Sequence, residues 1–123
     1  MNNTHKNFQQ IEIPVVKTLY DLYTITHELV SKFPKNERYS LGEKLENTLL
    51  ETIEYVVFGN VQQKNFKNAY ILKATTKIEL LKLFWRLALD IKVIDNKAYL
   101  KVQQHLQESG KMLGGWLKYL QAN

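Results

Sequence analysis

The apolar residues of this 123-residue chain recur at helical spacing in four blocks, and no stretch sustains the apolar–polar alternation of a β-strand. The blocks cover about residues 14–33, 36 or 40 to 60, 66–91 and 96–120. Four helices joined by short connections favour an all-α, up-down-up-down four-helix bundle. We expect one domain over residues 1–123, with residues 1–13 forming a flexible N-terminal tail.

Capping residues predict where the helices begin and end. The second helix has two candidate N-caps: Ser40, which forms a capping-box pattern with Glu43, and Asn36. Gly59 and Asn60 are expected to end that helix. Asp95 is expected to cap the fourth helix.

Three glycines, Gly110, Gly114 and Gly115, fall inside the fourth predicted helix. Each costs about 1 kcal/mol relative to alanine in a helix interior, so a helix retains them where a side chain is not wanted. Gly110 and Gly114 are four residues apart and share a face. We therefore expect close packing of another helix there, with Trp116 as an apolar anchor beside it and Gly114→Leu overpacking the bundle. This spacing gives no role to Gly115.

The third predicted helix carries two apolar stripes on roughly opposite sides. The first stripe consists of Ala74, Ile78, Leu81, Trp85 and Ala88. The second stripe consists of Leu72, Leu80, Leu83 and Leu87. A helix that is apolar on two sides must be covered on two sides, so we expect the second stripe to be an interface between copies of the chain. The alternative is a wide core-facing stripe with scattered surface leucines, which are common.

Charge is divided unevenly along the chain. Residues 1–60 hold six Lys/Arg and eight Asp/Glu, whereas residues 61–123 hold eleven and four, giving net charges of −2 and +7. A basic half of this kind predicts a surface that attracts a polyanion, although it is also compatible with a solvated face that aids solubility.

Basic side chains on the third helix are the candidate nucleic-acid contacts. They are Lys73, Lys77, Lys82 and Arg86, followed by Lys92 just beyond the helix. The first two and the next two are four residues apart, so each pair shares a face and suits a phosphate backbone, which is bound without base specificity. The opposing interpretation is that Lys82 pairs with Glu79, and Arg86 with Asp90, within the helix.

Motifs for catalysis, metal binding and membrane insertion are missing from the sequence. There is no cysteine, and His5, His27 and His105 lack metal-ligand spacing. No phosphate-binding glycine loop or nucleophile elbow occurs. We expect no catalytic residue, no metal, no cofactor and no enzymatic activity. No secretory signal or apolar run of membrane-spanning length is visible, so a cytoplasmic protein is expected.

Three short motifs resemble a known family. They are Phe33-Pro34-Lys35, Leu-Leu-Lys-Leu-Phe-Trp-Arg-Leu-Ala over residues 80–88, and Gly-Lys-Met-Leu-Gly-Gly-Trp-Leu over residues 110–117. The chain resembles Avd, the accessory variability determinant of diversity-generating retroelements, over about residues 14–120. It is similar, more distantly, to the four-helix-bundle proteins encoded in intervening sequences of bacterial 23S rRNA genes.

The resemblance to Avd implies a function. Avd proteins form positively charged homopentameric barrels that bind nucleic acid and associate with the element's reverse transcriptase. That complex copies a template RNA with errors at adenines, and Avd has no known catalytic activity. Lys82 and Arg86 match basic positions of the family's third-helix motif. The expected partners are therefore a reverse transcriptase, RNA and DNA contacted through phosphates, and further copies of the chain. The alternative is a structural oligomer without a polymerase partner.

Overall fold

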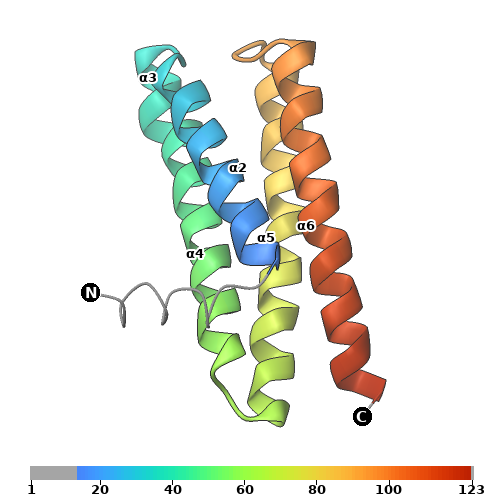
Figure 1. Ribbon diagram of the computed structural model, residues 1–123. Helices are drawn as coiled ribbons and strands as arrows, with labels where there is room; N and C mark the ends of the chain where they lie inside the picture. The colour runs from blue at the N-terminus through green and yellow to red at the C-terminus, as the bar shows by residue number, and fades with distance from the viewer. Residues whose placement is uncertain (1–13, 123) are drawn as a thin grey trace, which may run out of the picture.

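The computed structural model describes residues 14–122, and its helices run alternately up and down (Figure 1). The elements are α2 (Pro14–Ser31), α3 (Lys35–Glu37), the π-helical turn η1 (Arg38–Gly42), α4 (Glu43–Asn60), α5 (Lys64–Asp90) and α6 (Asn96–Ala122). No strand occurs in this part of the chain. The predicted all-α, up-down-up-down four-helix bundle is confirmed. The tail predicted for residues 1–13 lies outside the described residues.

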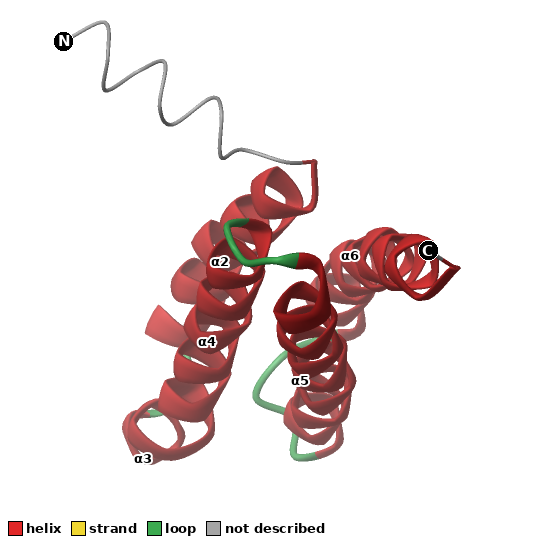
Figure 2. Cartoon of the chain, turned by 90° about the horizontal axis from the view of Figure 1, so that it is seen from below, coloured by secondary structure: helices red, strands yellow, loops and turns green. Residues whose placement is uncertain are grey.

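The four long helices surround one apolar core. Each packs against two neighbours, in the order α2, α4, α5, α6 around the bundle, which Figure 2 shows from below. The first stripe of α5 is fully buried, as the periodicity predicts. Trp85 lies in this core and meets the Phe33 ring edge to face, with 6.3 Å between the ring centroids. Such pairs prefer this arrangement because the positive edge of one ring meets the negative face of the other.

The second helical segment begins earlier than its sequence signals indicate. Pro34 has extended backbone angles (φ −54°, ψ 148°) and directly precedes Lys35, so the candidate cap at Asn36 is wrong. The capping box at Ser40 is wrong too, because Ser40 lies inside η1 and its hydroxyl donates to the Asn36 carbonyl at 3.0 Å. Such local bonds compete with capping. The cap at Asp95 is confirmed: its carboxylate accepts the Ala98 N–H at 2.8 Å.

Close approach between helices occurs at Gly59. A Cβ added there would lie 2.9 Å from the Cβ of Tyr70 and 3.1 Å from Cδ1 of Ile71. None of the glycines in residues 14–122 has a positive φ, so Gly59 does not end α4 in the left-handed conformation of a glycine cap. It is the last turn of α4 that packs tightly on α5.

The glycines of α6 have more room. A Cβ at Gly110 would make ordinary contact with Ile78 at 3.7 Å, whereas a Cβ at Gly114 or Gly115 would meet no packing partner within 4 Å in the described part of the chain. The close approach expected at Gly114 is therefore not made inside the bundle, because this residue is exposed on the flank of α6. Trp116 is partly buried against the core.

The second stripe of α5 faces away from the core. Leu72, Leu83 and Leu87 are 49%, 62% and 46% exposed, and Leu80 is half-buried. The stripe thus lies on the outside of the bundle, and its role as an interface stays a prediction. Across residues 14–122, no helix combines the length and apolar character needed to cross a membrane.

Candidate nucleic-acid interface

The five candidate cations do not form one patch. Nine residues separate Lys73 from Lys82, which at 3.6 residues per turn places them about 180° apart around α5. The first pair faces α4, where Lys77 contacts Glu51, and the second pair faces α6, where Lys82 lies beside Gly110. The structure brings together the members of each pair but separates the pairs across the outer face of the helix.

On the α6 side, both cations have partners within α5. Lys82 Nζ lies 3.2 Å from Glu79 Oε2, and Arg86 Nε lies 3.1 Å from Asp90 Oδ1. The hydrogen bond that Arg86 donates to the Asp90 carboxylate raises the pKa of Arg86, so the guanidinium stays charged. Exposed pairs of this kind contribute little to stability, and salt screens them. A phosphate can therefore take the place of either carboxylate at small cost.

A hollow between α5 and α6 adjoins Lys82. It has a volume of about 370 Å³ and is lined by Glu79, Lys82, Gln107, Gly110 and Lys111. Gly110 leaves the backbone of α6 uncovered there, while the two lysines come from different helices. The side chains of Lys82, Gln107 and Lys111 carry N–H donors suited to phosphate oxygens. The sequence indicates Lys111 only as part of the basic half, because the pairing of α5 with α6 is what makes it a neighbour of Lys82.

On the α4 side, the two lysines differ. Lys77 Nζ lies 3.2 Å from Glu51 Oε1 on α4. Lys73 Nζ instead lies 5.7 Å from the ring centroids of Tyr55 and Tyr70, and it makes no ion pair with any residue in the described range. Among residues 14–122, no carboxylate therefore neutralises its charge. The sequence spacing gives no sign of these aromatic partners, since Tyr55 lies on the preceding helix.

Lys92 lies in the turn after α5, away from both pairs. Its φ is 65°, the left-handed region that glycine usually occupies at the end of a helix. Its N–H bonds to the Leu89 carbonyl at 3.0 Å, and the Val93 N–H bonds to the Ala88 carbonyl at 3.0 Å. These two bonds form a Schellman motif, so Lys92 has a structural position as the helix terminator.

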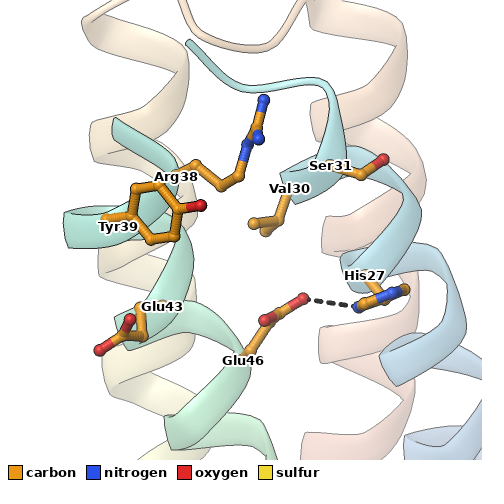
Figure 3. Close-up of a pocket in the computed structure, with 7 residues that line it drawn as sticks. All are labelled: His27, Val30, Ser31, Arg38, Tyr39, Glu43 and Glu46. Atoms are coloured by element: carbon orange, nitrogen blue, oxygen red, sulfur yellow. Dashed lines mark hydrogen bonds and ion pairs between the residues drawn. The ribbon is translucent and has the colours of Figure 1, made fainter. Parts of the chain in front are cut away.

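A separate pocket lies where the end of α2 meets η1 and the start of α4 (Figure 3). It has a volume of about 250 Å³ and is lined by His27, Val30, Ser31, Arg38, Tyr39, Glu43 and Glu46. His27 Nδ1 lies 2.9 Å from Glu46 Oε2, whereas the Ser31 hydroxyl donates to the Glu28 carbonyl at 2.6 Å. Ser31 is thus not paired with the histidine as an activated nucleophile would be.

Of the other two histidines, the structure describes only His105. His105 Nδ1 lies 3.0 Å from the Lys101 carbonyl, and His5 lies outside the described residues. Within residues 14–122, no three His, Asp or Glu side chains are grouped so that they could hold a metal ion.

The fold and the position of the cations define a class of protein: an all-α bundle whose basic half forms two adjacent helices, α5 and α6. A model of the bAvd-like family matches residues 13–120, which include all of α2, α4 and α5 and nearly all of α6. The chain belongs to this family, as its three short motifs indicate. Among proteins with curated descriptions, none matches the sequence.

Proposed function

We propose that this protein is a non-catalytic accessory subunit of a diversity-generating retroelement, which binds nucleic acid and associates with the element's reverse transcriptase. The observation that carries the proposal is the bAvd-like family match over residues 13–120. Template RNA and its cDNA are the proposed nucleic-acid ligands.

The distribution of charge supports nucleic-acid binding. The half of the chain with net charge +7 supplies α5 and α6, whereas α2, α3 and α4 belong to the half with net charge −2. Polyanion contacts are therefore proposed on the α5–α6 side, where Lys82 and Lys111 line the hollow between these helices and Arg86 follows Lys82 one turn along α5. Contacts to phosphate carry no base information, so sequence preference should be weak.

The outer face of α5 supports assembly. Leu72, Leu83 and Leu87 expose apolar side chains on one side of α5, which a second copy of the chain would cover. The family resemblance implies five copies. Repeating the cations around a ring would strengthen binding through avidity, because each further contact forms at a high effective concentration.

Co-expression with the reverse transcriptase encoded nearest to this gene tests the polymerase association. We expect the tagged protein to retain the reverse transcriptase through affinity and size-exclusion chromatography, also after nuclease treatment. A chromosomal neighbourhood without a reverse transcriptase gene and template repeats would favour a structural oligomer instead. Absence of co-purification, with the bundle intact by circular dichroism, would contradict the proposed partner.

A further inference from the structure

Three aromatic rings from two helices meet where the end of α4 lies beside the start of α5. Tyr55 and Tyr70 have ring centroids 6.3 Å apart, and Phe58 meets Tyr70 edge to face at 6.4 Å. We refer to Tyr55, Phe58 and Tyr70 as the aromatic cluster. Gly59 makes it possible, because the missing side chain lets α4 approach Tyr70 closely.

The aromatic cluster remains accessible at the surface. Phe58 is 51% exposed, while Tyr55 and Tyr70 are half-buried. Phe66 lies one helical turn before Tyr70 and is 56% exposed, which extends the aromatic surface along α5. Folding of the single chain therefore leaves several large rings partly in contact with water, which marks a binding surface.

Positive charge adjoins these rings. Lys73 lies over both tyrosines, held only by exposed cation–π contacts, which are weak. On the same flank, Glu51 pairs with Lys77 at 3.2 Å. The surface thus combines accessible rings with one cation that has no carboxylate partner among residues 14–122.

We infer that the aromatic cluster and Phe66 stack the unpaired bases of single-stranded nucleic acid, with Lys73 binding an adjacent phosphate. This inference rests on the proposed function and names the form of nucleic acid that this flank of α5 recognises. Sequence-tolerant single-strand sites combine aromatic platforms with backbone-tracking cations, as this surface does. A duplex keeps its bases stacked inside, so it offers the rings nothing to stack on.

The positive charge of Lys73, which has no carboxylate partner among residues 14–122, argues for nucleic acid over a further copy of the chain. The position of the aromatic cluster argues the same way. The apolar stripe proposed for assembly consists of leucines on the outer face of α5, whereas the aromatic cluster lies on the flank that faces α4. Assembly through the stripe would therefore use a different side of α5 from the one that carries the aromatic cluster.

The test compares three labelled oligonucleotides by fluorescence anisotropy: a single strand, a duplex of equal length, and an abasic strand with the same number of phosphates. Phe58→Leu/Phe66→Leu keeps the surface apolar but removes two rings. We expect it to weaken single-strand binding about fivefold or more, while duplex and abasic affinities stay at the wild-type values. Tyr20→Leu, which removes a 61% exposed ring from α2, should change none of the three affinities.

The outcomes separate a failure of the inference from a failure of the proposed function. If the double variant binds the single strand as tightly as wild type, or wild type binds the abasic strand equally well, the inference is overturned and nucleic-acid binding stands. If wild type binds none of the three, the proposed function fails. If the double variant loses oligomer mass in sedimentation, the rings form an interface between copies, which also overturns the inference. A single strand containing 5-iodouracil should photocrosslink to the aromatic cluster.

Discussion

At the scale of single residues, the glycines of this bundle differ in the space beside them that a side chain could occupy. Gly59 has none, because Tyr70 and Ile71 of α5 occupy the space beside it. A Cβ added at Gly114 or Gly115 would have no packing partner within 4 Å among residues 14–122. The bundle itself therefore explains the glycine in α4 but not the glycine pair in α6.

Gly59→Ala should lower the free energy of unfolding by about 1–3 kcal/mol, because the new methyl group forces α4 and α5 apart. Gly114→Ala is the matched control and should raise the free energy of unfolding by up to about 1 kcal/mol, the gain in helix propensity. Urea unfolding followed by circular dichroism measures both. A Gly59→Ala protein as stable as wild type would refute the close approach at this position.

Lys92→Gly should stabilise the protein by roughly 1 kcal/mol, since it relieves a left-handed backbone conformation that is costly for residues with a Cβ. Lys111→Gly, in the interior of α6, should have the opposite effect by about the same amount. Both substitutions remove one positive charge, so the loss of charge alone cannot change the free energy of unfolding in opposite directions. Equal destabilisation in the two variants would contradict the Schellman motif at the end of α5.

At the scale of elements, α5 faces four different surroundings. One side is buried in the core, one flank carries Lys73 beside the aromatic cluster, the other carries Lys82 and Arg86, and the outer side exposes the leucine stripe. A single helix can serve all four because neighbouring positions differ in direction by about 100°. The functional proposals therefore depend on this helix more than on any other.

Leu83→Glu/Leu87→Glu should dissociate the oligomer and leave the helix content unchanged, because a charge without a partner is too costly to bury at an interface. Leu50→Glu, at a 43% exposed position of α4, serves as a control and should leave the mass unchanged. Sedimentation velocity and circular dichroism measure the two effects. Wild-type protein that sediments as a monomer would eliminate the interface.

Helical periodicity could predict the four helices, both stripes of α5 and the cap at Asp95, because each depends on neighbours along one helix. The same holds for the Lys82–Glu79 and Arg86–Asp90 pairs. Periodicity could not predict contacts that need the distance between two helices. The open space at Gly114 and the aromatic cluster are of this kind. The start of the second helical segment was mispredicted because hydroxyl-to-carbonyl bonding at Ser40 has the same sequence signature as a cap.

At the scale of the whole molecule, the acidic and basic halves of the sequence become opposite sides of the bundle. The helices α2 and α4 lie on one side and α5 and α6 on the other (Figure 2). Long-range attraction of a polyanion would thus orient the protein before any contact forms. The proposed oligomer would repeat this side, so it would contact more phosphates at once than a single copy.

The salt dependence of nucleic-acid affinity tests the central claim most directly. Each phosphate neutralised should contribute a slope of about −0.7 to −0.9 to log K against log salt. Lys82→Ala/Arg86→Ala should lower both the slope and the affinity, to the same extent for every sequence tested. Lys32→Ala/Lys35→Ala removes two cations from the acidic half and should leave both unchanged. Fluorescence anisotropy titrations at several salt concentrations measure the affinity and its salt slope. Only variants that sediment like the wild-type protein are compared. Salt-independent binding, or a Lys82→Ala/Arg86→Ala protein that titrates like wild type, would contradict the account.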